Sequence, residues 1–171
     1  MFLENKNLFV RAKSSKTPTW FWKGEMSLHI TSKLINELEN YSDSFKTNCR
    51  ICIHTSPQEL CHVMLIVERK GMNIAPHKHF EKSDFVYIIK GEMEFIEFNN
   101  NGSKIKNITL NQFDGYKPLE GSIHAIGILS NSCTYLETST GPWLPKSDTQ
   151  YLEWSDKWHK QYLKKLSEDI K

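Results

Sequence analysis

The segment 71–91, GMNIAPHKHFEKSDFVYIIKG, constrains the fold of this chain more than any other part of the sequence. It contains two histidines separated by one residue, His77 and His79. Because residues i and i+2 of an extended strand project from the same face, the two imidazoles would point toward one place. A β scaffold can build half of a metal site in this way. The other ligands must come from elsewhere, and Asp84 and His124 are the candidates.

The length and charge of the chain limit the classes of protein to which it can belong. Its 171 residues are enough for one domain with a substantial core. No apolar run approaches the roughly 18 residues of a membrane span, and segment 1–15 lacks the features of a signal peptide. The net charge of +2 is too small to indicate a nucleic-acid partner. We therefore expect a single cytoplasmic domain, 1–171, that contacts neither nucleic acid nor membrane.

The four cysteines do not form a zinc-ribbon pattern. Cys49 and Cys52 make one CxxC motif, but a ribbon needs a second such pair. The sequence around them reads as a strand, which would place the two thiols on opposite faces. We interpret them as free thiols of a reducing cytoplasm rather than as metal ligands or disulfide partners.

The periodicity of the sequence predicts two helices that flank a region of strands. Residues 31–41 carry apolar side chains on a 3.6-residue period, and residues 152–170 carry them at four-residue steps. The intervening short β-rich segments, with turn signals such as 99–102, are typical of a sandwich or barrel. We divide the chain into an N-terminal arm (1–29), a helix (30–42), a β barrel (48–140) and a C-terminal helix (152–170).

The aromatic run Trp20-Phe21-Trp22 lies within the arm that we expect to be irregular. We favour a packing role for it, across a dimer partner or within the chain, because no polar residues converge beside it. The alternative is a stacking wall for a sugar or a base. Sheet edges and this arm also suggest a homodimer.

The spacing of segment 71–91 resembles the first cupin motif, in which a glycine, an HxH pair, a glutamate and a second glycine stand at these intervals. Asp84 occupies the glutamate position. Segment 118–124 is similar to the second cupin motif, with one extra residue between its proline and its glycine. Ile128 stands where that motif often has an asparagine.

Within the cupins, the chain looks most like the WbuC-type cupin-fold metalloproteins from about residue 30 to residue 154. The similarity includes the strand at 50–54, the segments 76–79 and 82–84, and the late segment 137–143. The resemblance implies an all-β cupin double-stranded β-helix, a jelly-roll barrel with a helix at each end. It also implies a bound metal and a role in the biosynthesis of bacterial surface polysaccharide, such as O-antigen or capsule.

The predicted ligands are His77, His79, Asp84 and His124. Three histidines and one carboxylate suit Zn, Fe, Mn or Ni and leave positions open for water or substrate. Asp84 is one methylene shorter than glutamate, so its carboxylate would reach the metal directly or through a water, and Glu81 is a fallback. The plainer alternatives are surface histidines on a polar loop, a strand-start cap at Asp84 and a structural histidine at position 124.

Other polar residues are candidates for the mouth of the barrel. Glu94 and Tyr116 are the predicted catalytic acid or proton donor, and Lys117 would bind an anionic sugar or phosphate. A solvated rim is the plainer interpretation of all three. His62 lies on a strand with Met64 and needs no special role, although contact with substrate or support of the ligands is an alternative.

Two classes of function follow from this set of residues. The first is an enzyme acting on a sugar or sugar-acid intermediate, with the metal as a Lewis acid for isomerisation or epimerisation, or with Fe(II) for O₂ chemistry. The second is a non-catalytic cupin that binds a small carbohydrate. A titratable side chain beside the metal would favour the enzyme. A metal-free epimerase is a third possibility, against which the intact HxH pair argues.

Overall fold

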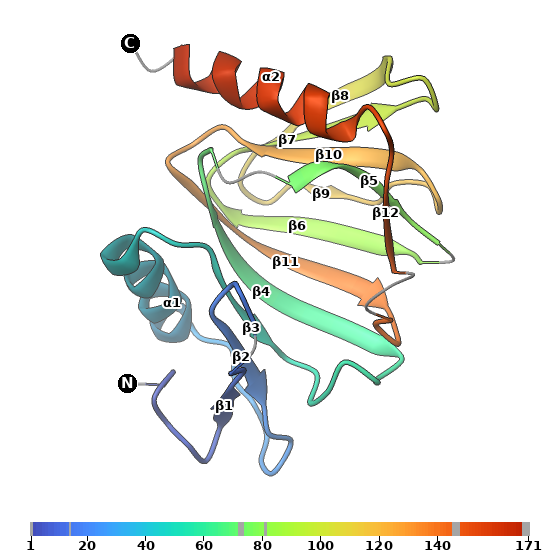
Figure 1. Ribbon diagram of the computed structural model, residues 1–171. Coiled ribbons are helices and arrows are strands. Elements are labelled where there is room, and N and C mark those ends of the chain that lie inside the picture. The colour runs from blue at the N-terminus through green and yellow to red at the C-terminus, as the bar shows by residue number, and fades with distance from the viewer. Residues whose placement is uncertain (1, 14, 72–73, 81, 145–147, 169–171) are drawn as a thin grey trace.

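The computed structural model describes residues 2–13, 15–71, 74–80, 82–144 and 148–168, and it consists of two facing β-sheets with one helix outside each (Figure 1). The first sheet contains seven strands, in the order β1 (Phe9–Arg11), β2 (Thr19–Trp22), β3 (Cys49–Cys52), β4 (Cys61–Arg69), β11 (Ser132–Thr140), β6 (Asp84–Lys90) and β9 (Gly115–Tyr116). The second contains five, in the order β12 (Thr149–Tyr151), β5 (Ile74–His79), β10 (Ile123–Ile128), β7 (Met93–Phe98) and β8 (Lys104–Leu110).

The two sheets are not joined into one closed barrel. Neighbouring strands are antiparallel except β2 and β3, and within the described residues no strand pair connects one sheet to the other. The consecutive strands β5 and β6 belong to opposite sheets, so the chain passes between the layers through a loop instead of a continuous ladder. The predicted jelly-roll barrel is therefore made of two facing sheets that are not closed into one.

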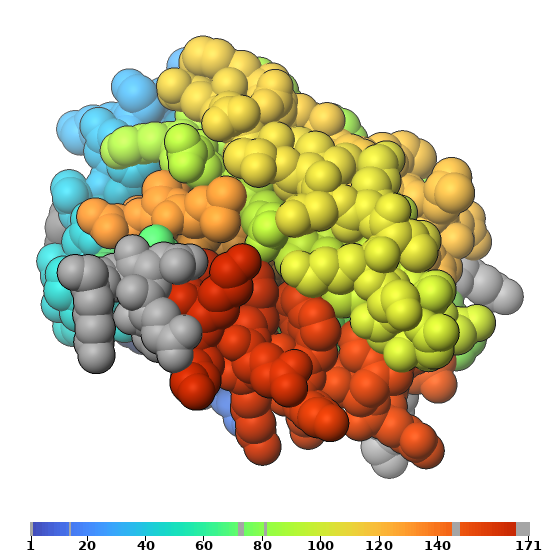
Figure 2. Space-filling model, turned by 90° about the horizontal axis from the view of Figure 1, so that it is seen from above, coloured from blue at the N-terminus to red at the C-terminus, as the bar shows by residue number. Residues whose placement is uncertain are grey.

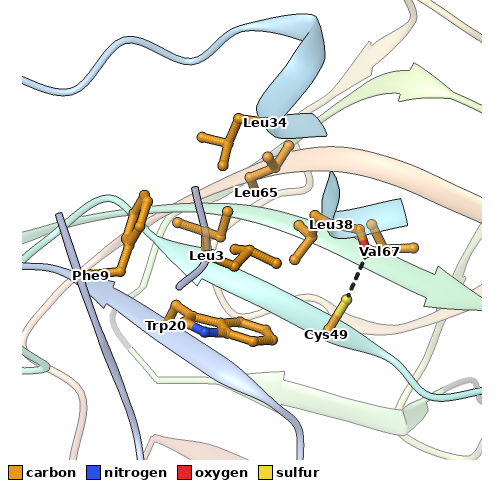
Figure 3. Close-up of a cluster of buried hydrophobic side chains, with 9 residues drawn as sticks. Leu3, Phe9, Trp20, Leu34, Leu38, Cys49, Leu65 and Val67 are labelled. Carbon is orange, nitrogen blue, oxygen red and sulfur yellow. Dashed lines mark hydrogen bonds between the residues drawn. The ribbon is translucent and has the colours of Figure 1, made fainter. Parts of the chain in front are cut away.

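Helix α1 (Ser32–Phe45) covers the outer face of the seven-stranded sheet. Thr31 caps the start of the helix. Its Oγ1 accepts a hydrogen bond from the Leu34 N–H at 3.3 Å and so satisfies one of the free backbone donors of the first turn. Leu34 and Leu38 then pack against the outward side chains of β4, as Figure 3 shows. The N-terminal segment completes this cluster, whose buried members are Leu3, Phe9, Trp20, Leu34, Leu38, Cys49, Ile51, Leu65 and Val67.

The N-terminal arm is not irregular as the sequence predicted, because it contains β1 and β2. Strand β2 pairs in parallel with β3 of the same chain. Alternation along β2 sends Trp20, which is 4% exposed, into the α1 cluster and turns Phe21 to the opposite face. Trp20 therefore packs within its own chain, whereas Phe21 lies on the wall of an internal cavity.

The two cysteines of the CxxC motif lie on opposite faces of the seven-stranded sheet. Cys49 belongs to the α1 cluster, whereas Cys52 faces the cavity between the sheets. Burial raises the pKa of the Cys49 thiol to about 12 and that of Cys52 to about 11. Both are therefore protonated at neutral pH, which disfavours a role as metal ligands.

Helix α2 (Ser155–Glu168) covers the outer face of the five-stranded sheet, and Figure 2 shows it in red beside the yellow strands β7 and β8. Trp158 stacks on Tyr162 and meets the Phe98 ring edge-on. The hydroxyl of Tyr162 donates to Glu94 Oε2 at 2.7 Å. A Cβ at Gly127 would fall 1.9 Å from that hydroxyl, so only glycine allows this approach. None of the helices in the described part of the chain is long and apolar enough to cross a membrane.

The space between the two sheets is filled at one end and hollow at the other. Apolar side chains, among them Ile88, Met93 and Ile128, fill the closed end. Val86 and Phe95 belong to this cluster and also line a cavity of about 450 Å³. The candidate site lies in that cavity.

Candidate metal centre

The structure brings His77, His79 and His124 together. His77 and His79 lie on β5, and His124 lies directly opposite His77 in the antiparallel pairing of β5 with β10. Directly paired residues project from the same face, and so do residues two apart on one strand. One nitrogen from each of the three imidazoles lies within 4.8 Å of the other two. The Nε2 atoms of His77 and His79 are 3.1 Å apart.

The backbone orients all three rings through their Nδ1 atoms. Nδ1 of His77 lies 2.9 Å from the carbonyl oxygen of Ala75, and that of His124 lies 3.1 Å from the carbonyl of Ser122. Nδ1 of His79 lies 2.8 Å from the carbonyl of Asp148. A carbonyl oxygen only accepts, so each Nδ1 carries the proton. Each Nε2 therefore presents a lone pair, as metal ligation requires.

Burial keeps two of these rings neutral. His77 is 5% exposed and His124 is 6% exposed. Loss of hydration lowers the pKa of His77 to about 4 and that of His124 to about 3. Phe95 stacks on His124 with ring centroids 5.2 Å apart, which contributes to that dry environment. His77 and His124 are therefore neutral at physiological pH, as ligation of a divalent metal requires.

Asp84 begins β6 in the opposite sheet and faces the triad. Its Oδ2 lies 3.9 Å from His79 Nε2, and burial raises the pKa of the carboxyl group. A carboxylate oxygen therefore lies beside the three imidazoles. The fallback ligand Glu81 lies outside the described residues.

The structure does not bring Glu94 or Tyr116 to the triad. Glu94 lies on the α2 face of β7, where its carboxylate accepts from Tyr162 and from Asn107 Nδ2 at 2.7 Å each. Tyr116 donates to Glu97 Oε1 at 2.6 Å and accepts from Lys106 Nζ at 2.9 Å. This geometry gives no support to their predicted roles in catalysis.

Lys117 is exposed and is not among the residues that line the cavity. Its ammonium group donates to the hydroxyl of Ser83, which immediately precedes Asp84. Its charge helps to lower the pKa of Asp84 against the stronger effect of burial.

A buried ion pair supports the centre from the C-terminal side. Lys82 Nζ lies 2.6 Å from Asp148 Oδ1, and the side chains are 9% and 8% exposed. The backbone carbonyl of the same Asp148 accepts from His79. Strand β12, which begins at the next residue, pairs Thr149 with His79. The pair therefore fastens the segment that orients His79.

The opposite wall of the cavity contains residues that the sequence analysis passed over. Arg50, His54 and Glu137 line it together with His62. Burial and the nearby charge of Asp84 raise the pKa of Glu137 to about 7. For Glu137, one indication of an inward direction was present in the sequence, which is the alternation along β11. Glu137 follows the buried Tyr135 by two residues and therefore lies on the same face of the strand.

Two facing, mainly antiparallel sheets with a histidine triad in their shared cavity define a cupin-type β fold. Two solved structures of CapF overlap with this chain, and the first is described as a capsular polysaccharide assembling protein from Staphylococcus aureus. The first has a TM-score of 0.52 at 15% identity. The second, solved with the inhibitor 3-isopropenyl-tropolone, has a TM-score of 0.51 at 16% identity. Each overlap covers 63% of this chain and 32% of CapF, so the chain spans about a third of CapF.

Sequence comparison adds a match to part of the chain but no activity. The model of a domain of unknown function, DUF6016, matches residues 30–110. No curated protein matches the chain. The likeness to CapF, at this level of identity, shows the cupin fold alone.

Proposed function

We propose that this protein is a metal-dependent cupin acting on a sugar or sugar-acid intermediate of bacterial surface polysaccharide biosynthesis. The observation that carries the proposal is the triad, in which one nitrogen from each of the three imidazoles lies within 4.8 Å of the other two, in a cavity. His77, His79 and His124 would hold the metal, with Asp84 as the fourth ligand. The neutral nitrogen donors and the carboxylate suit Zn, Fe, Mn or Ni.

The bound metal would act as a Lewis acid that polarises a carbonyl or hydroxyl oxygen of the substrate during isomerisation or epimerisation. The protein's own contribution is to exclude water and to position the substrate. The cavity of about 450 Å³ is in the usual range for a small-molecule site. Phe21, Trp143 and Tyr151 line it and offer aromatic surfaces to the apolar face of a sugar ring.

A titratable side chain inside the cavity favours an enzyme over a binding module. Glu137 lines the cavity, and no hydrogen bond to its carboxylate occurs among the described residues. We propose that Glu137 holds or receives the proton during the reaction, in the role that the sequence had suggested for Glu94 or Tyr116. Simple retention of a ligand would not need such a group.

The first test is elemental analysis of the purified protein beside a His77→Ala, His79→Ala double variant. We expect roughly one transition-metal ion per chain in the parent and a marked loss in the double variant. His29→Ala, at an exposed histidine, is the matched control and is expected to retain the metal. Equal metal content in the parent and the double variant would end the proposal.

We also propose the finer features that the family resemblance implies, namely a WbuC-type protein that is cytoplasmic and homodimeric. The exposed edges of the two sheets support the dimer, because an unpaired edge can bind a second copy. Light scattering tests this directly, and a monomer at micromolar concentration would contradict it.

A further inference from the structure

The cavity wall opposite the triad carries groups that the proposed metal chemistry does not use. Arg50 and Cys52 face inward from β3, and His54 continues the same alternation just beyond the strand. His62 faces inward from the adjacent strand β4. The triad lies on the other sheet, so a small molecule in the cavity would lie between the two walls.

Arg50 is a cation without an ion-pair partner in the described part of the chain. Its Nε donates to Thr19 Oγ1 at 3.2 Å, and Thr19 is itself 1% exposed and donates to Thr17 O at 2.8 Å. This contact fixes the guanidinium at one edge. Among the described residues, no carboxylate forms an ion pair with Arg50. The terminal nitrogens therefore remain for a ligand.

The ring of His54 is fixed by several contacts, and its Nε2 atom has no hydrogen-bond partner among the described residues. It is 6% exposed, and its Nδ1 lies 3.2 Å from both the amide nitrogen and the carbonyl oxygen of Val63. His62 stacks on the ring with centroids 4.3 Å apart and planes 18° apart. Phe21 meets the ring edge-on at 5.7 Å. A neutral imidazole can donate or accept at Nε2, and so can a sugar hydroxyl.

The charges that face this wall match a ligand with one negative charge. Lys82 is neutralised by Asp148, and Asp84 belongs to the proposed metal site. Glu137 lies near enough for the charge of Arg50 to lower its pKa, but it is not bonded to Arg50. One unpaired guanidinium therefore remains. It can compensate a carboxylate, whereas a phosphate dianion would retain an uncompensated buried charge.

We propose that Arg50 and His54 form a carboxylate-recognition subsite that selects a sugar acid as the substrate. Arg50 binds the carboxylate and His54 Nε2 bonds a neighbouring hydroxyl, while Thr19 and His62 position these two side chains. The inference rests on the proposed function only in assigning the other end of the substrate to the metal.

The test is calorimetric titration of the protein as purified, with its metal content measured in parallel. The probes are D-glucuronate, D-glucose and D-glucose 6-phosphate. Loss of a charge-assisted contact in Arg50→Gln is expected to weaken glucuronate binding at least about tenfold. Metal content and glucose binding are expected to stay unchanged. Arg69→Gln, on the outer face beside Asp43, is the matched control and is expected to bind glucuronate like the parent.

A second variant keeps the test decisive if Arg50→Gln does not fold. His54→Phe preserves a ring for the stack with His62 and removes the hydroxyl partner, so it is expected to weaken glucuronate binding several-fold. Equal glucuronate affinity in the parent, Arg50→Gln and His54→Phe would overturn the subsite. Absence of glucuronate binding to the parent, or tighter binding of glucose 6-phosphate, would also overturn it. Arg50-dependent binding by a parent that holds no metal would support the subsite and contradict the metal-dependent function.

Discussion

The buried ion pair between Lys82 and Asp148 allows the loss of stability in a Lys82→Met variant to be predicted. Lys82 Nζ lies 2.6 Å from Oδ1 and 2.7 Å from Oδ2 of Asp148, and neither side chain is more than 9% exposed. Replacing Lys82 with methionine leaves a carboxylate buried without its cation. Removal of one partner of such a pair costs about 3–5 kcal/mol of the free energy of unfolding. A third contact, from the Leu144 N–H to Oδ1 at 3.3 Å, places the result toward the lower end of that range.

The assay is urea unfolding of the parent, Lys82→Met and the double variant Lys82→Met, Asp148→Leu, with the slope checked for two-state behaviour. The double variant is expected to recover most of the loss, because it removes the isolated charge. Lys23→Met is the matched control, since Lys23 and Glu25 pair at 2.9 Å with side chains 31% and 60% exposed. Its cost is expected to stay below about 1 kcal/mol. Similar costs for Lys82→Met and Lys23→Met would refute the reasoning.

Two further predictions concern parts of the fold away from the metal. Burial raises the pKa of Glu68, which accepts from the Tyr135 hydroxyl at 3.1 Å, from its ordinary 4.5 to about 8. The folded state therefore binds this proton more tightly than the unfolded state, and stability falls as pH rises from about 4.5 to about 8. In Glu68→Gln the difference between urea midpoints at pH 5 and pH 8 is expected to shrink, and an unchanged difference would contradict this cause. Gly127→Ala is expected to cost about 1–3 kcal/mol, because the new methyl group would overlap the Tyr162 hydroxyl. Adding Tyr162→Phe is expected to restore part of the loss in thermal unfolding, and no recovery would exclude this clash as the cause.

The histidine triad could be predicted because its arrangement is mostly local. The interval between His77 and His79 fixes their common face on any extended strand. His124 needed the second, looser motif, since its position opposite His77 depends on the pairing of β5 with β10. Asp84 could be placed near the triad but not at a defined distance, because it lies on the other sheet.

The side on which Glu94 lies could not be predicted from the sequence, for a physical reason. Strand β7 is buried on both faces, by the core between the sheets and by α2. Apolar residues therefore occupy both faces, and the alternation that identifies an inward face disappears. The segment MEFIEF consequently gave no basis for deciding that Glu94 turns toward Tyr162 and away from the histidines.

The opposite wall was beyond sequence reasoning because its parts are assembled by long-range pairing. Arg50 lies on β3 and Glu137 on β11, and both strands pair with β4. No interval along the chain relates them. The inward direction of Arg50 also depends on β2, whose Thr19 orients the guanidinium, and that strand was expected to be irregular.

The orientation of the triad itself combines local and distant control. His77 and His124 each use a carbonyl two residues earlier in the chain, so their tautomers are set by the local backbone of β5 and of the start of β10. His79 instead uses the carbonyl of Asp148, 69 residues away. Its Nε2 is therefore directed into the centre only when the C-terminal segment is fastened by Lys82. Loss of that ion pair is expected to weaken metal binding through His79 alone, while the other two imidazoles keep their orientation.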